Sequence, residues 1–224
     1  MKKTLFSLAL LVAGLATTAH AQSGPRVGIK GGGSLSSFVG KNAKNLAYKP
    51  GFQAGVLFNF GLSDIVSLQP EVLYSQKGVT YEKNGRPFGL NDEVRSTLHY
   101  IDVPVLAKIT AGGNDDGTGL FFELGPQVSF LAGQRTVNDR TDDNLAGPLG
   151  KSTGSFNKVA GGFVAGLGYQ ITSGLGLGLR YTGDFSRVYK EGSYVADGTS
   201  VRQNNPNVRN SVFQLQAHYL FGGK

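Results

Sequence analysis

Six of the ionisable residues of the chain recur at similar places in separate segments, and their side chains can exchange protons or form ion pairs. These residues, called the charge belt below, are Lys30, Glu71, Lys108, Glu123, Arg180 and His218. His218 with Glu123 would suit acid–base chemistry, but no Ser or Asp is placed to complete a nucleophilic triad. Along the chain the first five alternate in sign, which favours ion pairing. We therefore expect a structural role for the charge belt and no enzyme.

Other candidate sites carry weaker signals. His99 has Ser96 close in sequence, but no Asp or Glu is placed to orient the imidazole. The run Asn138–Asn144, "NDRTDDN", lacks the spacing and glycine of a calcium loop, and Gly112–Gly117, "GGNDDG", is typical of a turn. The chain contains no Cys, which excludes disulfides and thiolate chemistry. We expect no catalytic residue, no metal site and no cofactor.

Alternation of apolar and polar residues dominates the chain after its first 25 residues. A period of two predicts strands, because successive side chains of a strand point to opposite faces. No stretch repeats apolar residues at helical spacing for three turns. We predict eight strands: Arg26–Phe38, Gly51–Gly61, Ile65–Tyr81, Arg95–Thr110, Gly119–Arg135, Phe156–Ile171, Leu175–Tyr189 and Arg209–Gly222.

The connections between these strands alternate in length. The long, polar ones are Val39–Pro50, Glu82–Val94, Thr136–Ser155 and Lys190–Val208, and the short ones are Leu62–Asp64, Ala111–Thr118 and Thr172–Gly174. Long loops at one end and tight turns at the other are typical of bacterial outer-membrane barrels. Each strand also has the ~9–11 residues that a tilted spanning strand needs. The predicted fold is all-β, an eight-stranded antiparallel up-and-down transmembrane β-barrel with both termini at the periplasmic end.

The last strand poses the question of which face points inward. In "SVFQLQAHYLFGG", apolar residues from Phe213 to Phe221 alternate with Gln214, Gln216 and His218. A soluble barrel would bury the apolar face, whereas a membrane barrel turns it to lipid and keeps the polar face inside. The loop pattern and strand lengths favour the membrane barrel. The charge belt would then line a narrow lumen, where its charges must pair to offset desolvation, and inward glycines would leave room for them.

Two further patterns bear on the strands. Aromatic residues gather near both strand ends, as in the girdles of membrane barrels: Phe58, Phe60, Phe122, Tyr169, Tyr219 and Phe221 at one end, and Phe38, Phe52, Tyr74, Phe130 and Phe213 at the other. Pro70, Pro104 and Pro126 fall inside strands, where a missing N–H interrupts the hydrogen-bond ladder. Bulges would accommodate these prolines and would shift the inward–outward alternation by one residue.

The N-terminus has the three parts of a secretory signal peptide, namely basic Met1–Lys3, an apolar segment and the site Ala19-His20-Ala21. We predict residues 1–21 as the signal peptide and 22–224 as the barrel domain. The apolar segment is shorter than the ~20 residues of a spanning helix. Loss of Lys2 and Lys3 lowers the formal net charge from +7 to +5. The basic residues form no run, so no nucleic-acid partner is expected.

Several stretches resemble the porin-like outer-membrane β-barrel domain family, the PorT-like small barrels of the OmpA/OmpX type. They are "VGIKGGGSLSSF", "GFQAGVLFNFGLSDIVSLQPEVLYSQKG", "YIDVPVLAKI", "FELGPQ" and "QLQAHYLF", which span essentially the mature chain. The resemblance implies a barrel in the cell outer membrane of a Gram-negative bacterium, without assigned biochemistry. It also implies that barrel-assembly machinery recognises the last strand, although Phe221 is here followed by Gly222, Gly223 and Lys224.

We therefore expect an integral outer-membrane barrel with a narrow, charge-plugged lumen and long extracellular loops, in a structural or interaction role that extends to secretion assemblies. Its expected partners are outer-membrane lipids and lipopolysaccharide, with barrel-assembly machinery during insertion, and the barrel is expected to be a monomer. The sequence identifies no extracellular or secretion partner. Three alternatives remain open: a small passive porin, an outer-membrane lipid-modifying enzyme and a soluble periplasmic ligand-binding barrel.

Overall fold

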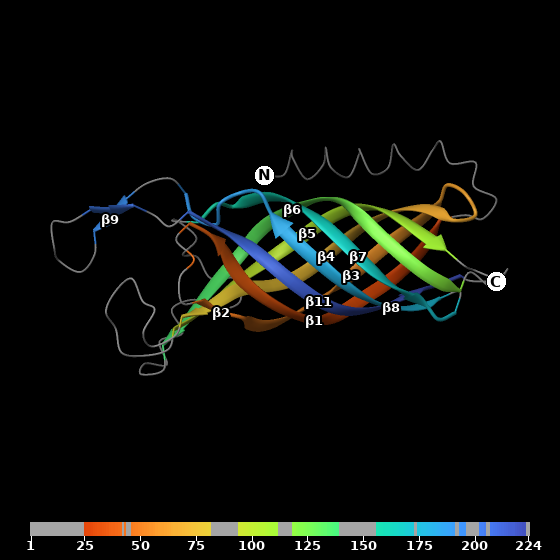
Figure 1. The fold of residues 1–224 in the computed structure, drawn as a ribbon, viewed down its shortest axis with the longest axis horizontal. Helices are drawn as coiled ribbons and strands as arrows, with labels where there is room; N and C mark the ends of the chain where they lie inside the picture. The colour runs from red at the N-terminus through yellow and green to blue at the C-terminus, as the bar shows by residue number, and fades with distance from the viewer. Residues whose placement is uncertain are drawn as a thin grey trace.

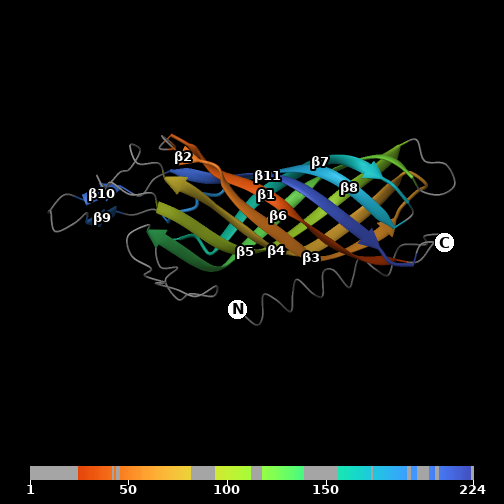
Figure 2. The same cartoon turned by 90° about the horizontal axis from the view of Figure 1, so that it is seen from below.

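Eight long antiparallel strands close into a barrel (Figures 1 and 2). The computed structural model describes residues 25–41, 43, 46–81, 94–111, 118–138, 156–172, 174–190, 193–195, 202–204 and 207–222. The barrel strands are β1 (Arg26–Gly40), β3 (Lys49–Gly61), β4 (Val66–Tyr81), β5 (Val94–Ala111), β6 (Gly119–Asn138), β7 (Val159–Gln170), β8 (Leu175–Asp184) and β11 (Val208–Leu220). Each pairs with the next along the chain, and β1 pairs with β11 to close the barrel. The predicted fold class is confirmed.

Three short strands accompany the barrel. β2 (Leu46–Ala47) extends the edge of β3 and pairs with β4. β9 (Ser193–Val195) and β10 (Arg202–Asn204) pair within the long, polar connection predicted at Lys190–Val208. In Figure 1 this small hairpin lies beyond the barrel end opposite to the C-terminus. Within the described residues, no helix has the length and apolar character that crossing a membrane requires.

The predicted strand bounds agree with the observed ones to within three residues, except at the end of β8. The prediction extended this strand to Tyr189, but Tyr189 meets Phe156, the predicted start of β7, only in an isolated bridge. The backbone N–H groups of Phe185 and Ser186 both donate to the Gly161 carbonyl, at 2.8 and 3.3 Å. The chain bends there, so β8 ends at Asp184.

Some predictions concern segments outside the described residues. They are the signal peptide of residues 1–21, the turn Gly112–Gly117, most of Asn138–Asn144, and most of the connections Glu82–Val94 and Thr136–Ser155. They stay predictions.

The sheet turns its polar face inward and its apolar face outward. Leu215 has 64% of its surface exposed, whereas its neighbour Gln216 has 2%. The same contrast holds between Leu124 and Glu123 on β6. A water-soluble protein shows the opposite arrangement, because apolar surface is driven out of water. The exposed band therefore faces lipid, and the soluble ligand-binding alternative is wrong.

The three prolines do not produce the predicted bulges. Pro70 and Leu73 of β4 pair with Val105 and Asp102 in one continuous register, and Pro126 stays in register with β7. The register of β5 with β6 shifts elsewhere, between His99 and Tyr100. A proline removes one N–H from the ladder but adds no residue, and only an added residue changes the alternation. Inward and outward positions therefore continue unchanged past each proline.

Apolar side chains form a cluster in the lumen near the long connections. The buried members of this upper cluster are Phe38, Val79, Leu98, Tyr100, Phe156, Val188 and Val208. Phe38 was predicted to lie in the outer aromatic girdle, but it is 3% exposed and points inward. The reason is the strand period, because Phe38 is an even number of residues from the inward Lys30 on β1.

Candidate functional site

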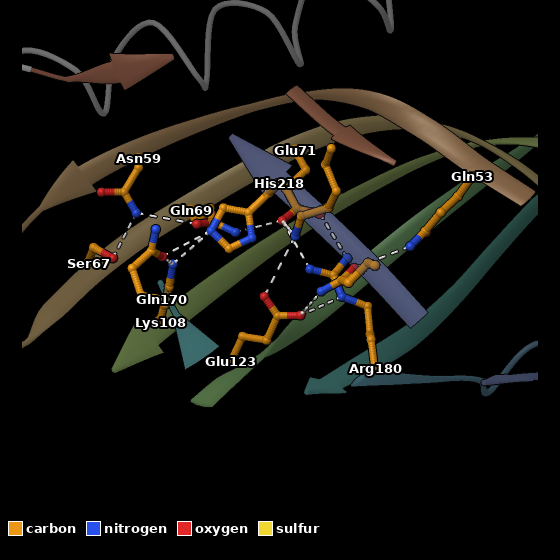
Figure 3. Close-up of polar contacts among 12 residues, drawn as sticks. Gln53, Asn59, Ser67, Gln69, Glu71, Lys108, Glu123, Gln170, Arg180 and His218 are labelled. Atoms are coloured by element: carbon orange, nitrogen blue, oxygen red, sulfur yellow. Dashed lines mark hydrogen bonds and ion pairs between the residues drawn. The ribbon is translucent and has the colours of Figure 1, made fainter. Parts of the chain in front are cut away.

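Four members of the charge belt meet at the centre of the lumen and are called the quartet: Lys30 on β1, Glu71 on β4, Glu123 on β6 and Arg180 on β8. Figure 3 labels Glu71, Glu123 and Arg180 of this group. Lys30 Nζ lies 2.5 Å from Glu71 Oε1 and 3.7 Å from Glu123 Oε2. Arg180 Nη1 lies 2.8 Å from Glu71 Oε2, and its Nε lies 2.6 Å from Glu123 Oε1. All four side chains are at most 1% exposed.

These ion pairs join opposite walls of the barrel. The strand order around the barrel is β1, β3, β4, β5, β6, β7, β8 and β11, so β1 faces β6 and β4 faces β8. The Lys30–Glu123 contact and the Arg180–Glu71 contact each span the lumen, and together they cross it in two directions. Eight strands leave an interior just wide enough to be filled by side chains, which is why such contacts form at all.

Neutral side chains complete the hydrogen bonding of the quartet. Gln69 Nε2 donates to Glu71 Oε1 at 2.7 Å, and Gln216 Nε2 donates to Glu123 Oε1 at 2.9 Å. Gln53 Nε2 in turn donates to the side-chain oxygen Oε1 of Gln216 at 3.2 Å. Two cations and two carboxylates leave no net charge in the quartet. Balanced charge and added hydrogen bonds are the conditions under which a buried ion pair offsets its desolvation.

The other two members of the charge belt, Lys108 and His218, form a separate lower pair near the short turns. Lys108 Nζ lies 2.9 Å from Gln170 Oε1 and 3.3 Å from His218 Nε2. It also sits 4.4 Å from the centroid of the Phe121 ring, in a cation–π contact. Among the residues described, no carboxylate lies within ion-pair distance of Lys108. The predicted single belt is therefore two groups.

Neither described histidine is placed as a catalytic group. His218 Nε2 contacts Gln170 and Lys108, and no contact joins it to Glu123 within the described part of the chain. His99 lies on the outer wall, stacked on Tyr74, with its Nδ1 2.6 Å from the Tyr74 hydroxyl. Ser96 is an odd number of residues away on β5 and is buried on the inner face. No acid–base pair or nucleophilic dyad forms among these residues.

A second ion pair above the quartet was missed by the sequence analysis. Lys77 Nζ lies 3.0 Å from Asp102 Oδ1 and 3.1 Å from the Ser129 hydroxyl, and Ser75 donates to Asp102 at 2.6 Å. The signal was available, because Lys77 shares the inward alternation of Glu71, and Asp102 that of Lys108. The prediction considered only residues near the short-turn end and so omitted this pair.

Glycines on β7 and β8 provide the room for the long luminal side chains. A Cβ atom at Gly166 would lie 2.6 Å from Glu123 Oε1. A Cβ atom at Gly176 would collide with the His218 ring, and one at Gly168 with the Phe121 ring. These distances are shorter than van der Waals contact allows, so the positions require glycine unless the luminal side chains shift.

A metal centre has no support in the part of the chain that the structure describes. No group of three or more His, Cys, Asp or Glu residues is arranged there to hold a metal ion. What the arrangement offers is a lumen crossed by paired charges, with an apolar cluster above them.

Comparison with known proteins places the chain among bacterial barrels. The family model described as "Outer membrane protein beta-barrel domain" matches residues 20–188. No curated protein sequence matches the chain. The solved structure of Neisserial surface protein A is similar over 88% of this chain and 99% of that chain, with 13% identity and a TM-score of 0.52. That likeness shows a shared fold.

Two further solved structures are similar to the chain over most of their length. OprG from Pseudomonas aeruginosa matches with 12% identity, covering 89% of this chain and 96% of that chain, at a TM-score of 0.49. Ail from Yersinia pestis matches with 11% identity, covering 88% and 98%, at a TM-score of 0.40.

Proposed function

Because the chain belongs to the outer membrane protein beta-barrel domain family, it is an outer-membrane barrel, and we propose that its own side chains close its lumen to ions. In this proposal the barrel is a support. It anchors its long connections at the cell exterior, where they meet partners.

The observation that carries the proposal is the crossing of the lumen by the quartet. An ion passing along the axis would have to separate Arg180 from Glu71 and Lys30 from Glu123. These two contacts cross the lumen in two directions. Separating a buried pair leaves each charge without its partner at low dielectric, and removing one partner typically costs about 3–5 kcal/mol. A conducting pore needs binding weak enough for ions to leave. The quartet, whose charges are already paired with one another, does not offer such weak binding to a passing ion.

The upper cluster adds a second obstacle of a different kind. Phe38, Leu98 and Val208 come from three strands and pack together above the charges. A hydrated ion would lose its water in this apolar constriction, at a large cost in free energy. Charged and apolar barriers in series support a closed lumen better than either alone.

With a closed lumen, the surfaces left for function are the outer wall and the long connections. The hairpin of β9 and β10 lies beyond the barrel rim (Figure 1), where a partner can reach it. A structural or interaction role follows, and a secretion assembly is one form that such a partner takes. The placement of the long connections outside the cell is part of this proposal.

Conductance in planar lipid bilayers tests the closed lumen. We expect the purified wild-type protein to conduct rarely or not at all. Replacing Glu71 and Glu123 with Gln removes the two carboxylates that pair with Lys30 and Arg180, and we expect an anion-selective leak. Gln127→Asn, which changes a luminal residue but no charge, is the control. Large, steady wild-type channels would replace the proposal with the passive-porin alternative.

Protease added to intact cells tests the orientation separately. We expect cleavage within Thr136–Ser155 or Lys190–Val208. Cleavage confined to Leu62–Asp64 or Thr172–Gly174 would show that the barrel is inserted the other way. Heat-modifiable migration on a denaturing gel, with fractionation of the membranes, confirms in the same samples that the barrel is folded.

A further inference from the structure

One sector of the outer wall carries a continuous row of aromatic rings toward the long connections. The row runs Tyr48, Phe213, Tyr181, Phe163 and Phe185, with successive ring centroids 6.4, 5.1, 5.8 and 5.4 Å apart. Its barrel members come from three adjacent strands, β11, β8 and β7. Rings in this position mark the boundary between acyl chains and headgroups.

An apolar hollow of about 760 Å³ lies against the same strands, on the short-turn side of the aromatic row. Its lining includes Gly33, Leu35, Leu167, Leu179 and Leu215. Gly33 points outward, and a Cβ atom placed on it would have nothing within 4 Å, so the wall is recessed there. The three leucines at 167, 179 and 215 are all more than half exposed. A recess between leucines fits acyl chains.

Exposed cations stand on the other side of the aromatic row. Arg209 lies on β11 and Lys41 follows β1, and both side chains are exposed. Along β11 the outward positions read Arg209, Ser211, Phe213 and Leu215, so the backbone of Arg209 lies about 13 Å along the strand from that of Phe213. Of the acidic residues described, Glu71, Asp102, Glu123 and Asp184 are buried in the lumen and Asp64 is in a short turn. No described carboxylate competes for these cations at this rim.

We propose that this sector, called the lipid wall and formed by Gly33, Leu167, Leu179, Phe213, Leu215 and Arg209, binds one phosphate-bearing lipid with several acyl chains, of the lipid A type. The acyl chains occupy the hollow, the sugar or glycerol edge lies at the aromatic row, and Arg209 contacts phosphate. The inference rests on the proposed orientation, because it places the cations in the outer leaflet.

A second copy of the barrel fits this surface less well. A symmetric contact would use the same patch on both barrels, and it would bring Arg209 toward its own copy. Like charges at low dielectric oppose such a contact. A phosphate group neutralises the same cation, so charge complementarity selects the lipid.

The test counts lipids bound to the folded barrel. The protein is refolded into phosphatidylcholine vesicles containing diphosphoryl lipid A in both leaflets, so the result does not depend on orientation. After mild detergent extraction, native mass spectrometry counts lipid A per barrel. We expect one retained lipid A in the wild type and at least a fivefold loss in the variant Arg209→Glu. Arg95→Glu on β5, the strand opposite β11 in the ring, is the charge-matched control and should retain it.

A second variant and a cross-link make the outcome decisive. Gly33→Phe fills the hollow without changing charge, and we expect it to lower retention as well. No retention in the wild type, or equal loss in both charge-reversal variants, would overturn the proposal while leaving the protease and conductance results intact. The chain has no Cys, so disulfide dimers of Leu215→Cys would identify a second copy as the occupant and would also overturn it. Heat-modifiable migration confirms that each variant is folded.

Discussion

The quartet and the lower pair bury charge in the same lumen by different means. In the quartet, Lys30 and Arg180 each contact both Glu71 and Glu123, so every charge has two partners of opposite sign. In the lower pair, Lys108 has the Gln170 amide oxygen, the His218 ring nitrogen and the face of Phe121. The quartet carries no net charge. The charge of Lys108 is instead stabilised by the dipoles of neutral side chains and by the face of the Phe121 ring.

The difference separates contacts that stabilise the folded barrel from contacts that only lower the cost of burying a charge. Breaking a balanced buried pair leaves its partner stranded, whereas removing a lone buried cation removes its desolvation cost as well. Substitution at the quartet should therefore destabilise the barrel, and substitution at Lys108 should not. The following experiments test that contrast, from the largest expected effect to the smallest.

The double variant Glu71→Gln/Glu123→Gln should be the most destabilised. Lys30 and Arg180 would stay buried without a carboxylate, which should lower the free energy of unfolding by at least about 3–5 kcal/mol. Urea unfolding in lipid vesicles measures it. The charge-balanced variant Lys30→Met/Glu123→Gln keeps the Arg180–Glu71 pair and should lose clearly less. Equal losses in the two variants would mean that charge balance does not govern the quartet.

Charge placed on the outer wall should be costly without any partner being removed. Leu124→Arg points into lipid at mid-span and should cost about 2–4 kcal/mol. Gln127→Arg points into the lumen, beside Ser129, and should cost little if the lumen accommodates the longer side chain. The same unfolding assay compares them. Similar losses at the two positions would contradict the inward and outward assignment.

Gly166→Ala should disturb the quartet through space alone. Its Cβ atom would stand 2.6 Å from Glu123 Oε1, and overpacking of this kind costs about 1–3 kcal/mol. Gly33→Ala is the matched control, because its Cβ atom has open space. The two variants differ in the free energy of unfolding if the quartet is tightly packed. A cost at Gly33 equal to that at Gly166 would point to backbone effects of glycine instead.

Lys108→Met should have the smallest effect. The Met side chain keeps most of the apolar stem against Phe121 while removing a charge that has no carboxylate partner among the described residues. We expect the free energy of unfolding to change by less than about 1 kcal/mol or to rise. A loss as large as that of the quartet variants would show that Lys108 balances charge at longer range.

The sequence predicted the strands well because a period of two is a local property. Inward positions such as Glu71 and Glu123 follow from alternation alone, and the same rule, applied consistently, would have placed Phe38 inside. Contacts across the lumen were harder to predict, because they depend on the tilt and stagger of strands that are distant in sequence. That is why the split between the quartet and Lys108 was not foreseen. The early end of β8 follows from a backbone bend that alternation does not encode.

The crossing of the lumen by the quartet has a consequence for how the barrel assembles. Its four members come from the first, third, fifth and seventh strands of the closed ring. A partly assembled sheet holds these charges on one open face, with opposite partners still far apart. Sequence-distant contacts of this kind form late and slow folding. We therefore expect the Lys30–Glu123 and Arg180–Glu71 contacts to form only when the ring closes, which favours the closed barrel over an open sheet in the bilayer.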